Sequence, residues 1–142
     1  MKNLKPKIEK VLVKTINEHN DFYKAYAEND KILVEWKDPD MNKNGPEEWF
    51  FVPDYDHEEE FCFTCDGGPG WDAMNPYDAD YPDYDFEVKL DKNFEKAGLF
   101  CEPYASWKHC VVENKTRNKQ QRLRKRRGTK RRSRISTSKR RF

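Results

Sequence analysis

Four cysteines and one histidine have the residue types, and part of the spacing, of a structural zinc site. Cys62 and Cys65 form a C-x-x-C pair followed by Asp-Gly-Gly, a turn typical of metal-binding knuckles. A second C-x-x-C is missing, so reduced thiols without a metal and a redox C-x-x-C stay open as alternatives. Zinc is the one cofactor that the sequence suggests. The predicted ligands are Cys62, Cys65, Cys101 and Cys110, with His109 as the alternative fourth ligand.

A second kind of chemistry is concentrated near the C-terminus. Residues 113–142 carry 15 of the 28 lysine and arginine residues and all ten arginines. Guanidinium groups are weakly hydrated and bind phosphate through two parallel hydrogen bonds, so a segment that prefers arginine indicates nucleic acid. The predicted phosphate contacts are Arg117, Arg122, Arg124, Lys125, Arg126, Arg127, Lys130, Arg131, Arg132, Arg134, Lys139, Arg140 and Arg141.

This arginine-rich arm does not distinguish RNA from DNA. An acidic protein surface or an anionic membrane would also attract it, but it lacks the apolar face that membrane binding uses. The clusters 125–127 and 130–132 would serve as nuclear import signals in a eukaryotic cell. In composition the arm is similar to the genome-binding tails of some viral capsid proteins and to the tails of ribosomal proteins, so a host cell or a virion is an alternative location.

The rest of the chain has the opposite charge. Residues 1–112 hold 13 lysines against 25 carboxylates, a formal charge of about −12, whereas residues 113–142 carry about +14. We therefore predict an acidic globular domain over 1–112 and a separate arm over 113–142. The acidic domain would repel phosphate, so we expect it to bind a protein partner or further copies of itself. The alternative is an interaction or inhibitor protein whose acidic face docks on a basic, nucleic-acid-binding partner.

No catalytic motif is found, and the histidines at 19, 57 and 109 lie in different predicted elements, so we expect a protein that is not an enzyme. The segment Asp40-x-Asn42-x-Asn44-Gly45 matches half of a calcium loop, but Phe51 stands where a bidentate glutamate is needed. A turn between two strands explains it better. No segment has the roughly 20 apolar residues of a membrane span, which together with the cysteines favours an intracellular protein without a membrane partner.

The elements that must position these groups follow from hydrophobic periodicity. An amphipathic helix is predicted over 6–29, with Pro6 in its first turn. Aromatic residues, Phe100 and Trp107 among them, are expected to fill much of the core. The predicted fold class is α+β, with this N-terminal helix, a small and mainly antiparallel sheet, and a disordered basic C-terminal arm. The predicted strands are 31–36, 47–52, 60–64, 84–90, 99–101 and 106–112.

Overall fold

The computed structural model describes residues 3–42, 44–55, 60–65, 67–78 and 84–114, and it confirms the α+β class with an N-terminal helix. The predicted disorder of the arm falls on residues outside these ranges, apart from Glu113 and Asn114. In chain order the elements are α1 (Lys5–His19), β1 (Tyr23–Glu28), β2 (Lys31–Trp36), the short helix η1 (Pro39–Met41), β3 (Glu47–Phe51), β4 (Cys62–Thr64), α2 (Gly68–Met74), η2 (Pro76–Asp78), α3 (Asp85–Lys96), β5 (Leu99–Ala105) and β6 (Lys108–Glu113).

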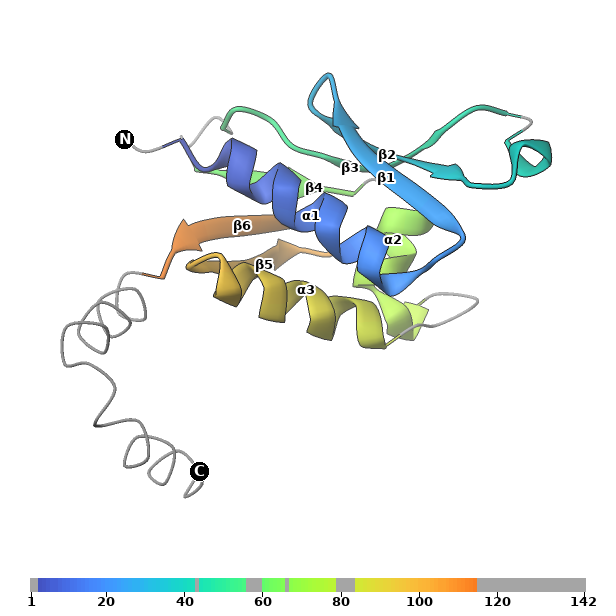
Figure 1. Ribbon diagram of the computed structural model, residues 1–142. Coiled ribbons are helices and arrows are strands. Elements are labelled where there is room, and N and C mark those ends of the chain that lie inside the picture. The colour runs from blue at the N-terminus through green and yellow to red at the C-terminus, as the bar shows by residue number, and fades with distance from the viewer. Residues whose placement is uncertain (1–2, 43, 56–59, 66, 79–83, 115–142) are drawn as a thin grey trace, which may run out of the picture.

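The strands form one antiparallel sheet in the order β1-β2-β3-β4-β6-β5. The strand β6, last in the sequence, therefore lies inside the sheet between β4 and β5, and β5 lies at an edge. Figure 1 shows α1 and α3 side by side along the sheet. The domain is thus a layer of helices packed on one face of a sheet, and we call that face the inner face.

The core lies between these two layers. Successive residues of a strand point to opposite faces, and the inner-face residues Ile32, Phe50 and Phe63 are almost fully buried. Aromatic rings make the central contacts. Phe63 meets Phe50 edge-on with centroids 5.4 Å apart, and Phe50 stacks on Phe86 of α3 at 6.3 Å. Phe100 and Trp107, in contrast, are each 48% exposed, so the prediction that they fill the core was wrong.

The predicted helix over 6–29 is too long, since α1 ends at His19 and Tyr23–Glu28 form strand β1. β1 and β2 make a tight hairpin in which Glu28 faces Lys31 across the two-residue turn Asn29-Asp30. Both turn residues are left-handed, with φ of 51° and 67°, as a type I′ turn requires. Tyr23 and Tyr26 of this strand are three residues apart, and that spacing also fits a helix, which explains why the predicted helix was too long.

The predicted strand over 84–90 was also wrong, because Asp85–Lys96 form the helix α3. Phe86, Leu90 and Phe94 recur every four residues and are all buried, whereas Val88 is 53% exposed. The alternation of residues 86, 88 and 90 imitates a strand only if the pattern is cut off at residue 90. Phe94 extends the pattern with a period that belongs to a helix.

The sequence analysis missed the helix α2, which lies against β3. A Cβ atom added to Gly70 would come within 1.8 Å of the carbonyl oxygen of Trp49. Only glycine therefore lets α2 approach the β3 backbone so closely. No hydrophobic period marks this helix, because its two buried residues are Gly70 and Met74, and one of them has no side chain.

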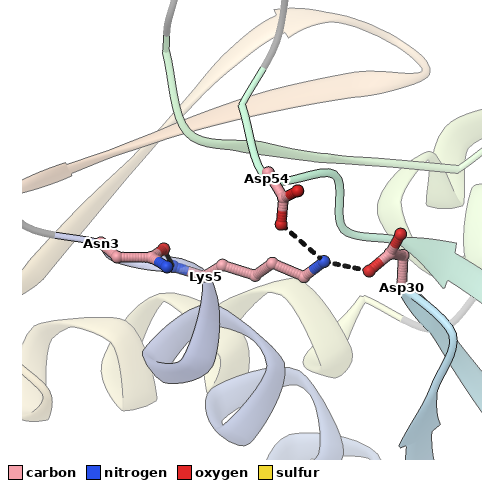
Figure 2. Close-up of polar contacts among 4 residues, drawn as sticks. All are labelled: Asn3, Lys5, Asp30 and Asp54. Carbon is pink, nitrogen blue, oxygen red and sulfur yellow. Dashed lines mark hydrogen bonds and ion pairs between the residues drawn. The ribbon is translucent and has the colours of Figure 1, made fainter.

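An ion-pair cluster joins the start of α1 to the β1–β2 turn and to the segment after β3 (Figure 2). The ammonium group of Lys5 donates hydrogen bonds to Asp30 and, at 3.2 Å, to Asp54. Burial lowers the pKa of Lys5, but the hydrogen bonds and charges of the two carboxylates raise it by a larger amount. The net pKa therefore lies above the usual 10.5. Lys5 is therefore charged throughout the physiological pH range.

The helical assignment of α3 predicts opposite outcomes for two neighbouring apolar residues. Phe86→Ala should lower the free energy of unfolding by about 3–5 kcal/mol, because it opens a cavity in the core. Val88→Ala should change it by no more than about 0.5 kcal/mol, because this side chain lies at the surface. Urea denaturation of both variants measures this, and equal losses at the two positions would support a strand instead.

The Lys5 cluster predicts a modest stabilisation. Lys5→Met keeps the alkyl chain and removes the charge, and it should cost about 1 kcal/mol or less, because both carboxylates are largely exposed. Since the pKa of Lys5 is raised, the contribution is complete at pH 7 and disappears only as pH rises through that pKa. Lys7→Met, on the exposed surface of the same helix, is the control, and thermal unfolding of the two should differ at low salt only.

Candidate functional site

The sheet divides the four cysteines between its two faces. Cys62 of β4 and Cys110 of β6 lie directly opposite each other, so their side chains share the outer face. Cys65 follows Cys62 by three residues and belongs to the buried core. The ladder continues through it, since its backbone N–H donates to the Trp107 carbonyl at 2.8 Å. A spacing of three in a strand thus sends the two sulfurs of the C-x-x-C pair to opposite faces.

Cys101 of β5 lies opposite Val111 and packs against the core, on the same side as Cys65. Burial raises the pKa of Cys101 to about 12, with a smaller contribution from Asp91 and Glu87 of α3. Burial also raises the pKa of Cys110 to about 11, together with the hydrogen bond from its sulfur to the Glu60 carboxylate at 3.6 Å. Both thiols are therefore protonated at neutral pH, which makes them slow nucleophiles.

The metal prediction concerns the same residues. Of the predicted ligands, the structure brings Cys62 and Cys110 together on the outer face, and it holds Cys65, Cys101 and His109 on the inner face. Among the described residues, no group of three or more histidine, cysteine, aspartate or glutamate side chains is arranged to hold a metal ion. His57 and Asp66, which flank β4 in the sequence, lie outside the described residues. Structural zinc stays a prediction.

His109 is a buried histidine rather than an accessible base. Its ring stacks on Phe63 with centroids 5.1 Å apart and an interplanar angle of 13°, and only 5% of the residue is exposed. Burial lowers its pKa to about 4, so the ring is neutral at pH 7. Its Nε2 atom has no hydrogen-bond partner among the described residues. A neutral imidazole that faces the core is suited to packing and cannot exchange protons with solvent easily.

The outer face carries an exposed group of apolar side chains that the sequence analysis did not identify. Phe100 of β5 lies opposite Val112 of β6, and about half of each side chain is exposed. Tyr104 lies on the same face, with the ammonium group of Lys108 4.7 Å from its ring centroid. Phe51 of β3, opposite Thr64, is exposed there too. We call Phe51, Phe100, Tyr104 and Val112 the outer apolar surface.

The arm follows directly from β6. The predicted phosphate contacts, from Arg117 to Arg141, lie outside the described residues. The domain ends in regular pairing, because Glu113 lies opposite Leu99 and the Asn114 N–H donates to the Gly98 carbonyl at 2.9 Å. The chain therefore leaves the sheet beside Val112 of the outer apolar surface, and the described core is complete before the first arginine of the arm.

The calcium-like segment lies in the connection between β2 and β3, where the described residues include the short helix η1 and leave out residue 43. The side-chain amide of Asn42 bonds both backbone groups of Trp36: its oxygen accepts from the N–H at 2.8 Å, and its nitrogen donates to the carbonyl at 2.7 Å. Asp38 caps the short helix η1 by accepting from the Asp40 N–H at 3.0 Å. These polar groups hold the β2–β3 connection together.

A depression of about 210 Å³ lies between the end of α1 and α2, and His19 and Asp72 are among the residues that line it. It is smaller than the sites that usually hold small molecules. The Nδ1 atom of His19 lies 3.2 Å from the Lys89 ammonium group, and the ring of His19 is nearly perpendicular to that of Phe86, with centroids 5.4 Å apart. The absence of enzymatic activity stays a prediction, since no contact here tests it.

Comparisons of the chain with protein-family models, with curated proteins and with solved structures found no match. Across the described ranges, none of the helices has the length and apolar character needed to span a bilayer. Functional inference therefore depends on the residues themselves.

The buried state of His109 predicts a loss of stability in mild acid. The unfolded chain takes up a proton near pH 6.5, but the folded protein does so only near pH 4. The unfolded state thus holds more protons between these values, and stability falls as pH falls, by up to about 3 kcal/mol for a shift of this size. His109→Phe should preserve the stacking on Phe63 and remove this part of the decline.

The measurement is urea denaturation of metal-free protein from pH 7 to pH 4. Carboxylates contribute to acid sensitivity in every variant, so the informative quantity is the difference between the profiles of wild type and His109→Phe. Val88→Ala, at an exposed residue that does not titrate, is the control and should keep the shape of the wild-type profile. Parallel profiles for wild type and His109→Phe would show that His109 is protonated normally in the folded protein.

Proposed function

We propose that this chain is a non-enzymatic nucleic-acid-binding protein. In this proposal the arm, residues 113–142, contacts RNA or DNA phosphates largely independently of sequence, and the acidic domain, residues 1–112, binds a protein partner or further copies of itself. The observation that carries the proposal is the placement of all ten arginines within these 30 residues. An intracellular location, with entry into the nucleus in a eukaryotic cell, belongs to the same proposal.

The physical basis of this binding is the release of counterions. Each lysine or arginine that neutralises a phosphate frees a condensed cation, so affinity falls as salt rises. If eight of the arm's cations contacted B-DNA, the slope of log K against log salt would be roughly −7. Binding of this kind is tight at low salt and has little preference among sequences, because phosphates carry no sequence information.

Two features of the fold support separate roles for the arm, which would bind nucleic acid, and for the domain, which would bind protein. The described core consists of residues between Leu4 and Val111, and none of them belongs to the arm. The outer apolar surface supplies the kind of exposed aromatic and aliphatic side chains found at protein interfaces. The domain's net negative charge opposes direct contact with phosphate, which favours a protein as the ligand of this surface.

The proposal predicts that the arm is necessary for binding nucleic acid. Full-length protein should bind single- and double-stranded RNA and DNA with a steep salt dependence, and a chain ending at Asn114 should lose at least about a hundredfold in affinity at 0.15 M salt, because it lacks these cations. Ending at Asn114 preserves the hydrogen bond to Gly98. Fluorescence anisotropy measures binding, circular dichroism confirms folding, and sedimentation of the shortened chain reports self-association.

A variant with all ten arginines of the arm replaced by lysine keeps the charge and removes the guanidinium groups. It therefore distinguishes the contribution of charge to binding from that of the bidentate contacts. It should keep the salt slope and lose affinity, because lysine cannot form the bidentate contact. Equal binding by the full-length and shortened chains would refute the role of the arm. Absence of binding by either chain at 0.15 M salt would favour the alternative, in which the acidic face docks on a basic, nucleic-acid-binding protein.

A further inference from the structure

Cys62 and Cys110 occupy a special position in the β4–β6 ladder. The Val111 N–H donates to the Phe61 carbonyl at 2.9 Å, and the Cys65 N–H donates to the Trp107 carbonyl at 2.8 Å. Both bonds join residues that lie opposite each other, so residues 61 and 65 mark the hydrogen-bonded positions. Because such positions alternate along an antiparallel ladder, Cys62 and Cys110 form a non-hydrogen-bonded pair.

This position brings two side chains closer than any other in a sheet. Opposite residues at non-hydrogen-bonded positions have Cα atoms about 4.5 Å apart, within the range of about 4.4–6.8 Å that a disulfide spans. Both side chains lie on the outer face, and neither sulfur takes part in a disulfide. The other two cysteines point toward the core, so neither competes for this pairing.

Access differs between the two sulfurs and sets the order of reaction. Cys110 is half-buried, whereas Cys62 is only 1% exposed. An external oxidant therefore meets Cys110 first, and Cys62 is the neighbouring thiol placed to resolve the product. Because the Cys110 thiol is mostly protonated at neutral pH, the exchange is slow, and its product is judged at equilibrium.

We propose that Cys62 and Cys110 are a cross-strand dithiol that closes to a disulfide in the presence of a low-molecular-weight disulfide such as oxidised glutathione. The Cys110 thiolate attacks the oxidised glutathione, which forms a mixed disulfide and releases one reduced glutathione. The Cys62 thiolate then attacks the Cys110 sulfur and displaces the second. Each protein thiol loses its proton to solvent or to a leaving thiolate, both cysteines are oxidised, and one glutathione disulfide is reduced to two thiols.

The product would link β4 to the internal strand β6, whose end continues into the arm. It closes a loop that contains α2, α3 and β5, so the oxidised chain should unfold at a higher temperature than the reduced chain. This linkage is independent of any role of the arm, and it requires no metal. If the same two sulfurs instead held a metal ion, they would be protected from oxidation.

The test equilibrates full-length, metal-free protein with mixtures of reduced and oxidised glutathione until the product ratio is constant, because protonated thiols react slowly. Free thiols are then blocked with iodoacetamide and peptides are mapped by mass spectrometry. The expected result is one intramolecular disulfide, found in a peptide pair that contains Cys62 and Cys110. Cys65 and Cys101 should be recovered in alkylated form from the unfolded, blocked protein.

Variants supply matched controls. Cys110→Ser should abolish the cross-link and the rise in melting temperature on oxidation, whereas the Cys65→Ser, Cys101→Ser double variant should keep the cross-link if it folds. Should that double variant unfold, the peptide map of the wild type decides alone. A persistent mixed disulfide at Cys110, a bond between Cys62 and Cys65, or no disulfide even in excess oxidised glutathione would overturn the proposal.

Discussion

The described helices cover one face of this sheet, and the alternation of side chains along each strand determines which residues they cover. In β6 that alternation separates two neighbours. His109 points into the core, stacks on Phe63 and has a lowered pKa, whereas Cys110 points outward and lies opposite Cys62. The same rule places Leu99 inside and Phe100 outside on β5. Strand geometry therefore determines both which side chains fill the core and which thiols, those of Cys62 and Cys110, lie on the outer face.

The chain also separates opposite charges along its length. The domain completes its core and its last strand pairing by Asn114, and the dense run of arginines begins only after it. In the proposed function, the residues of the described core stabilise the domain and the arginines of the arm bind polyanions, so the two properties depend on different residues. Conversely, the loss of a buried ring such as Phe86 would destabilise the domain and leave the charges of the arm unchanged.

The hydrophobic pattern and Pro6 predicted the class of fold, the start of α1 and five of the six described strands, because these signals come from residues close together in the sequence. The prediction failed at Phe86, Val88 and Leu90, whose spacing fits a strand as well as a helix. It also failed at Gly70, where a close contact with the backbone of β3 determines the position of α2. It could not find the pairing of Cys62 with Cys110, since nothing local shows that β6 lies between β4 and β5. The arginine-rich arm could be recognised without any knowledge of the fold, because it is defined by composition alone.

The internal position of β6 has a consequence for biosynthesis. Until residues 108–113 have been translated, β4 and β5 lack the strand that joins them, and both expose unpaired edges that invite aggregation. The β4–β6 and β5–β6 pairings both wait for residues 108–113, so the sheet closes only after all the other described strands have been synthesised.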